Sequence, residues 1–258
     1  MSTLLERALR HDRLVAMAAI TAVTVLAWSY TVWLAAGMDM PPGLHEAMAA
    51  VIAPWTVSQF LIMWAMWAVM MVGMMLPSVT PMCLIYARVA RHARGQGRPI
   101  ASAGWFASGY LLAWAIFAVA ATLAQWSLEQ AALLSPMALS VSGALGSAIL
   151  VVAGLFQLTP WKDACLSQCQ APLVFIQRHG GFRRDPGGSL LLGARHGLYC
   201  IGCCWALMCL LFVAGIMNID WIAAITVFVL LEKIAPPKLH VARIAGIALI
   251  AAGAWTLS

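Results

Sequence analysis

Long apolar stretches separated by short polar connections dominate this chain. They predict helices at about 14–36, 58–81, 103–125, 139–158, 197–217, 220–232 and 243–257. About 20 mostly apolar residues in a helix are enough to cross the hydrocarbon core of a bilayer. The pattern therefore predicts the all-α fold class, as a single polytopic membrane bundle of about seven transmembrane helices over residues 1–258.

The composition supports a membrane protein. Apolar residues make up 63% of the chain and charged residues only 9%, with a mean hydropathy of +0.90. Soluble domains carry about 25% charged residues, so a soluble catalytic domain is excluded and the lipid bilayer is the first expected partner. The net charge is +6, and in a membrane protein the basic residues chiefly determine how the chain is oriented in the bilayer. We therefore expect no nucleic-acid partner.

The basic residues predict the orientation of the chain. They occur before the first apolar stretch, after the second, between the fourth and fifth, and between the sixth and seventh. A seven-helix path puts these segments on one side, which the positive-inside rule makes cytoplasmic. We therefore expect a cytoplasmic N-terminus and an external C-terminus. The first stretch is longer than the roughly 7–15 residues of a signal-peptide core, so we expect it to be retained.

Two connections are long enough to consider separately. Residues 160–196 contain Gly180-Gly181 and a Pro-Gly-Gly run at 186–188, which predict turns rather than a domain. The connection Met38–Glu46 combines two thioethers, an imidazole and carboxylates. It is interpreted equally well as an external receiving site for a cation or as a solvated loop.

Methionines concentrate in the second apolar stretch. Met63, Met66, Met70 and Met74 recur at steps of three and four, which places them on one helix face, and Met82 follows. Thioethers are soft ligands suited to Cu(I), but methionine also fills irregular gaps between helices, and the stripe alone favours packing. Pro77 in the same helix removes a backbone donor, so a carbonyl near Gly73 needs another partner.

The cysteines give a stronger signal. The chain has 7 of them, an odd number, so a framework made only of disulfides is excluded. Cys200, Cys203 and Cys204 have the spacing of one helix face, and Cys165 and Cys169 share a face if their segment is helical. The predicted topology brings all five to the cytoplasmic side. Reduced thiols there favour metal ligation, and thiolates favour Cu(I), zinc or an iron–sulfur centre.

An acidic residue is expected at membrane depth. Glu232 lies near the inner end of the sixth stretch, where an ionisable group is costly. Its neighbour Lys233 cannot share its helix face, so we expect a partner such as Lys162 or Arg195. A structural ion pair and a functional role both fit the position.

Several of these strings resemble a bacterial family of predicted metal-binding integral membrane proteins, domain of unknown function 2182. The resemblance covers about 60–235 and rests on Met63–Ser78, Pro81-Met82, Lys162–Cys165, Cys169, Cys200–Met208, Gly215–Asn218 and Glu232-Lys233. It implies a multi-pass protein of the bacterial inner membrane that binds a metal. It implies no reaction, and whether the protein is an enzyme is uncertain, because we find no catalytic motif.

The leading hypothesis is a protein that binds a soft transition metal, with copper the first candidate, for transport, storage or delivery. The expected ligands are Cys165, Cys169, Cys200, Cys203 and Cys204, with Met70, Met74 and Met82 as thioether partners. A metal donor or acceptor protein, or other membrane subunits, would be the protein partners. Two alternatives remain: a membrane thiol-disulfide oxidoreductase, and a non-catalytic subunit of a membrane complex.

Overall fold

The computed structural model describes residues 2–37, 55–134, 139–141 and 143–256, which are helical with short connections. The helices are α1 Ser2–Ala36, α3 Val57–Gly95, α4 Ala103–Gln130, α5 Gly143–Gln157, α6 Pro160–Gln170, α7 Pro172–Arg178, α8 Pro186–Cys209, α9 Leu211–Ala214, α10 Ile219–Ile234 and α11 Val241–Trp255, with a 3-10 turn at Pro237–Leu239. The connection Met38–Glu46, interpreted above as a receiving site for a cation or a solvated loop, lies outside the described residues.

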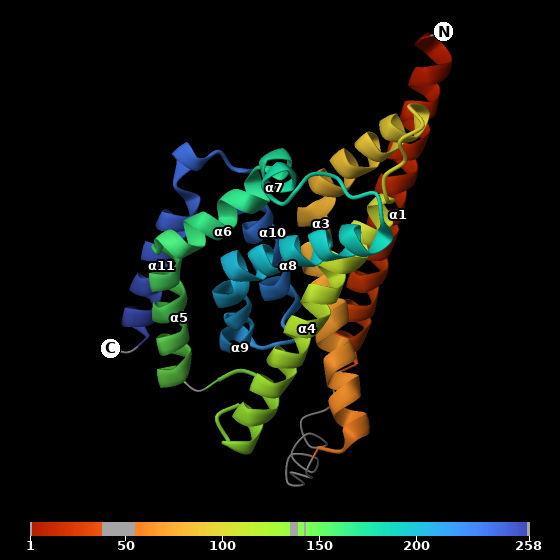
Figure 1. The fold of residues 1–258 in the computed structure, drawn as a ribbon. Coiled ribbons are helices and arrows are strands. Elements are labelled where there is room, and N and C mark those ends of the chain that lie inside the picture. Colours follow the sequence, from red (N-terminus) through yellow and green to blue (C-terminus); the bar gives the residue numbers. More distant parts are fainter. Residues whose placement is uncertain (1, 38–54, 135–138, 142, 257–258) are drawn as a thin grey trace.

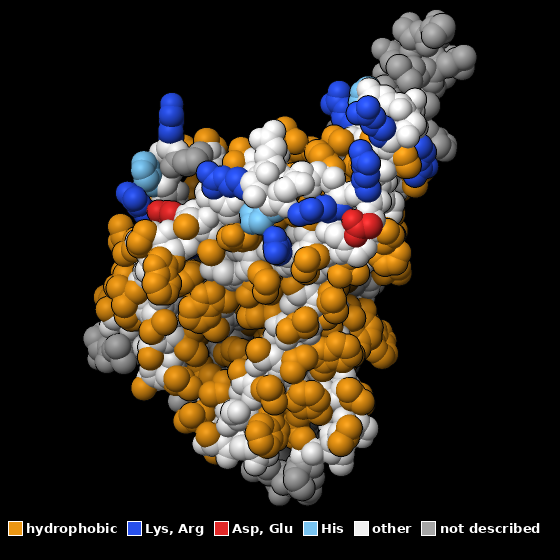
Figure 2. All heavy atoms as spheres, viewed as in Figure 1, with side chains coloured by type: hydrophobic (Ala, Val, Ile, Leu, Met, Phe, Trp, Pro, Cys, Tyr) orange, Lys and Arg blue, Asp and Glu red, His pale blue; other side chains and the backbone are white. Residues whose placement is uncertain are grey.

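The helices form a bundle with one capped end. The long helices α1, α3 and α4 run side by side, α5 pairs with α11, and α6 and α7 lie across the upper end in Figure 1. α1 begins at that end and α11 finishes toward the other. Figure 2 shows Lys and Arg side chains gathered near the same upper end on this face, above a largely hydrophobic surface. The predicted all-α class is confirmed for the described part of the chain.

Within the described ranges, four helical stretches are long and apolar enough to cross a membrane: Leu14–Ala36, Val57–Gly95, Ala103–Gln130 and Pro186–Ala214. α5 and α6 would count as a fifth if they form one span, but they meet at a bend of 67°. α10 and α11 have only 16 and 15 residues. Helices therefore occur at all the predicted apolar stretches, while the number of seven spans stays a prediction.

The expectation of turns in the connection 160–196 is confirmed at Gly180 and Gly181, both with positive φ, and wrong at residues 186–188, which begin α8. Apart from Ala171 and residues 179–185, this segment forms α6, α7 and the first half of α8. Pro160, Pro172 and Pro186 each occupy the start of a helix. Proline is favoured there because the first helical N–H groups have no partner within the helix. Cys165 and Cys169 are therefore on a helix, as chelation by this pair requires.

The expected partner for a carbonyl freed by Pro77 is confirmed. α3 continues through Pro77 and Pro81 to Gly95 instead of ending near residue 81. The indole Nε1 of Trp28 donates to the Gly73 carbonyl oxygen at 3.2 Å. α1 thus supplies the hydrogen bond that the proline cannot, and the bond ties α1 to the middle of α3.

Glycines bring α4 and α8 into backbone contact. A Cβ at Gly109 of α4 would overlap the Leu190 carbonyl, and a Cβ at Gly193 of α8 would overlap the Phe106 carbonyl. A Cβ at Gly197 would lie 2.6 Å from the Ala113 Cβ. Small residues allow membrane helices to approach in this way, so the crossing fixes where α8 presents the residues that follow Gly197.

Candidate metal centre

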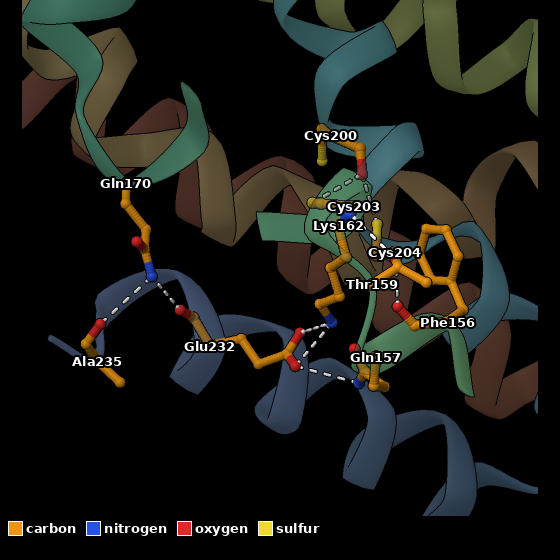
Figure 3. A network of polar contacts seen from close by, with 10 residues as sticks. All are labelled: Phe156, Gln157, Thr159, Lys162, Gln170, Cys200, Cys203, Cys204, Glu232 and Ala235. Atoms are coloured by element: carbon orange, nitrogen blue, oxygen red, sulfur yellow. Dashed lines mark hydrogen bonds and ion pairs between the residues drawn. The ribbon is translucent and has the colours of Figure 1, made fainter. Parts of the chain in front are cut away.

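α8 carries three buried thiols within little more than one turn. Cys200, Cys203 and Cys204 are each at most 2% exposed, and all follow the glycine contact with α4. The thiols of Cys203 and Cys204 donate to the Cys200 carbonyl oxygen at 3.1 and 2.8 Å (Figure 3). The spacing thus stacks them on one face, as predicted from the sequence.

α6 brings two further thiols against α8. Its first turn is capped by Thr159, whose hydroxyl accepts from the Lys162 N–H at 3.3 Å. Downstream, the Cys165 sulfur lies against the Cα of Gly202, where a side chain would leave it no room. The Cys169 thiol interacts with the thiols of Cys200 and Cys203. Cysteines about 30 residues apart in sequence therefore lie close together. This agrees with the prediction that the cysteines of both segments lie at the same side of the bundle.

The thiol of Cys200 contacts polar side chains from two other helices, α10 and α4. Lys233 of α10 donates from Nζ to the Cys200 sulfur at 2.9 Å and to the Ser78 hydroxyl at 2.7 Å. The Tyr110 hydroxyl of α4 lies 3.1 Å from the same sulfur. An ammonium group at this distance favours the deprotonated thiol, which is the form that binds metals.

An ion pair fixes α6 to α10. Lys162 donates to both carboxylate oxygens of Glu232 at 2.7 Å, and both side chains are almost fully buried. Gln157 donates to the same carboxylate at 3.1 Å, and Gln170 donates to the Glu232 backbone carbonyl at 2.8 Å (Figure 3). The predicted partner Lys162 is confirmed. The ion pair holds the first turn of α6 and the Gln170 hydrogen bond holds its end, so α10 fixes the helix that carries Cys165 and Cys169.

The methionines separate into two groups. Met70 and Met74 are buried within the apolar core of α3. Met82 is also nearly buried, but it lines a pocket of about 740 Å³ together with Cys169, Lys233 and His196. Met82 is therefore the predicted thioether that shares a cavity with a candidate thiol. Cys209 lines a different cavity beside Trp205, away from the other cysteines.

The thiols are close but do not form a finished coordination shell. All 7 cysteines are free. Within the residues that the structure describes, no three or more His, Cys, Asp or Glu side chains are arranged to hold a metal ion. The thiols of Cys203 and Cys204 point to a backbone carbonyl instead, so metal binding would require them to rotate.

Lys233, Ser78 and Tyr110 were missed in the sequence. A lysine at membrane depth is itself unusual, and Lys233 could have been suspected on that ground. Ser78 and Tyr110 gave no signal, because only the packing of helices brings Tyr110 to the Cys200 sulfur and Ser78 to Tyr110 and Lys233.

A soft-ligand cluster of this kind suits monovalent copper. Residues 64–256 match the PpoB2 family, described as copper chaperone. The chain belongs to the PpoB2 copper chaperone family. The matched range contains every cysteine and methionine proposed as a ligand, whereas α1 lies before it. The family supports the copper-related part of the sequence hypothesis, and it does not test the name domain of unknown function 2182.

Beyond the PpoB2 family, no curated protein and no solved structure matches the chain.

Proposed function

We propose that this protein is a multi-pass protein of the bacterial inner membrane that binds Cu(I) and delivers it to a partner protein. The observation that carries the proposal is the meeting of Cys169 on α6 with Cys200 and Cys203 on α8 inside the bundle. Thiolates are preferred ligands of monovalent copper, and two helices that approach each other can supply the low coordination number it accepts.

The proposed ligands are the thiols of α6 and α8, assisted by a thioether at the pocket. They are Cys165, Cys169, Cys200, Cys203 and Cys204, with Met82 as the thioether. Met70 and Met74, deeper in the same helix, have a sufficient explanation as core packing. We therefore expect these two methionines to pack rather than to bind the metal.

Charge balance supports Cu(I) as the cargo. Two thiolates around a monovalent cation leave one negative charge, which is costly in a low-dielectric interior. Lys233 lies 2.9 Å from the Cys200 sulfur and can neutralise that charge. A divalent ion with two thiolates would be neutral, and the added ammonium would then be unfavourable.

The proposed topology has seven passes with the N-terminus in the cytoplasm. In Figure 1, α1, α4 and α11 run down the view and α3, α5 and α10 run up it, while α8 first crosses the view and then turns downward; Figure 2 shows basic side chains near the end where α1 begins. This arrangement would place α6 and the thiols near the cytoplasmic face. Copper would then be taken up from that side, and the short helices α5, α10 and α11 would span a locally thinned bilayer or tilt little.

The rival function is thiol-disulfide exchange, because a thiol beside an ammonium is also activated as a nucleophile. One experiment separates the two. The full chain is purified in detergent under reducing conditions and titrated with Cu(I) against a chromophoric chelator. Cys209→Ser serves as the matched control. Serine at Cys200, Cys203 and Cys204 should sharply weaken binding, since a hydroxyl is a poor ligand for a soft ion.

The two functions predict opposite results. Wild-type protein that takes up no Cu(I), but forms a disulfide reversibly between these cysteines by alkylation mapping, would replace copper binding with thiol exchange. Equal Cu(I) affinity in the triple serine variant and in Cys209→Ser would remove the α8 cysteines from the site.

A further inference from the structure

We infer that His196 is a transfer ligand, an imidazole that holds Cu(I) transiently between the open pocket and the buried thiols. The inference rests on the proposed function, since it concerns the same cargo. It assigns a metal-contacting role to a residue outside the ligand set above and names the pocket as the route.

His196 lies on α8 one turn before Cys200, so the two side chains project from the same helix face. The residue is only 3% exposed. Its Nδ1 atom is buried, and among the described residues it has no hydrogen-bond partner. Buried polar atoms without partners are few in native proteins, and each one requires an explanation.

Aromatic rings hold the imidazole in place without using its nitrogen atoms. The ring centroids of Phe106 and Tyr110 each lie 5.8 Å from that of His196, and Phe175 lies at 4.8 Å. These contacts come from α4 and α7. A ring that is positioned by packing, with a nitrogen left free, is suited to accept a metal ion and to release it again.

The pocket connects this imidazole with soft donors. His196 lines the cavity of about 740 Å³ together with Cys169 and Met82, while Met17 and Thr24 of α1 form its outer wall. Lys233 lines it too and also contacts the Cys200 sulfur. The cavity is therefore bordered by an imidazole, a thiol and a thioether, and it leads to the thiols of α8.

The proposed step is a ligand exchange without change of oxidation state. One bond between Cu(I) and the His196 nitrogen breaks as one bond between Cu(I) and a thiolate sulfur forms, and the reverse occurs on release. Copper stays monovalent throughout. The thiolate that loses copper keeps its negative charge beside the Lys233 ammonium, so the exchange needs neither an oxidant nor a reductant.

The test compares rates rather than amounts. Cu(I) is presented to the full chain as its glutathione complex, and loading and release are followed separately. His196→Phe keeps a ring for the aromatic contacts but has no donor atom, and His196→Met restores a soft donor without the ring. We expect His196→Phe to slow loading and release at least tenfold with affinity changed less than threefold, and His196→Met to recover most of the rate.

His179→Gln is the matched control. His179 also stacks on Phe175, at 4.4 Å, but its Nδ1 already lies 2.8 Å from the Phe175 carbonyl oxygen, and it does not line the pocket. Its replacement should leave both rates unchanged. If His196→Phe does not fold, His196→Gln takes its place. The comparison with His196→Met still distinguishes the loss of a soft donor atom from the loss of the ring.

Two results would overturn the inference. One is a loading rate in His196→Phe equal to that of the wild type. The other is equal slowing in His196→Phe and His196→Met, which would show that the imidazole shape matters and its nitrogen does not. Both are distinct from failure of the proposed function, in which the wild-type chain would bind no Cu(I) at all.

Discussion

Lys233 donates a hydrogen bond of 2.9 Å to the sulfur of Cys200, although the two residues lie on different helices and 33 positions apart. The same Nζ contacts Ser78 at 2.7 Å, so α3, α8 and α10 meet at one ammonium group. Before copper binds, the Lys233 ammonium supplies the positive charge that a thiolate at Cys200 needs in the protein interior. It therefore offers a reason why a thiolate can persist inside the bundle before copper arrives.

Replacing Lys233 with methionine should weaken Cu(I) binding. The change removes the ammonium while keeping an unbranched apolar chain, and we expect a loss of about tenfold in affinity, equivalent to about 1.4 kcal/mol. Alkylation of Cys200 should also become slower. Lys238→Met is the control, because Lys238 is an exposed lysine on the same side of the predicted topology. Unchanged affinity and alkylation in Lys233→Met would show that the contact has no role in binding.

Glu232→Gln should destabilise the protein more than Glu129→Gln. The first change leaves the buried Lys162 ammonium without its counter-ion, and breaking a buried pair in this way costs about 3–5 kcal/mol. Glu129 accepts from Trp55 and Gln125 at 2.9 Å in a half-buried position, where an amide oxygen can still accept. Thermal unfolding in the same detergent measures the difference.

The pair can be tested further by removing both charges. Lys162→Met combined with Glu232→Gln should recover much of the stability lost in the single variant, because no uncompensated charge remains. If the double variant is no more stable than Glu232→Gln, the ion pair is not the source of the loss.

Leucine substitution should distinguish the methionines of α3. Met70→Leu and Met74→Leu preserve volume and apolarity, so they should cost less than about 1.5 kcal/mol and leave Cu(I) affinity unchanged. Met82→Leu should be equally stable but load Cu(I) more slowly, because Met82 lines the pocket. Copper titration and loading rates of the three variants provide the measurement. Weaker binding in Met70→Leu would instead assign the buried stripe to the metal.

The topology can be checked with reporters. A fusion after residue 258 should behave as external, and an insertion at Gly181, in the turn between α7 and α8, as cytoplasmic. All the basic residues lie in segments that this path puts on one side. A cytoplasmic C-terminus would overturn the seven-pass path and the argument that the thiols lie near the cytoplasmic face.

Periodic patterns in the sequence predicted much of the fold and part of the site. The apolar stretches marked each long helix, the cysteine spacing placed Cys200 and Cys204 on one face, and the cost of an isolated charge pointed from Glu232 to Lys162. Each of these inferences depends on local geometry or on one strong energetic requirement, which a sequence carries directly.

The remainder depended on contacts between helices. Residues 186–188 were interpreted as a turn because they read Pro-Gly-Gly, but Pro186 starts α8 and its cap, Asp185, stands immediately before it. The neighbours of Cys200 require three helices to cross at one point. No pattern along the chain records that crossing, so Tyr110 could not be predicted.

The glycine contact between α4 and α8 determines which parts of the molecule are free to move when metal is exchanged. Because Gly109 and Gly193 bring the two backbones together, neither helix can slide or rotate without steric overlap. The backbone that carries Cys200, Cys203 and Cys204 is therefore held in place against α4. Access must then depend on rotation of side chains around the pocket, where α1 contributes the outer wall although it lies outside the part of the chain matched by the family.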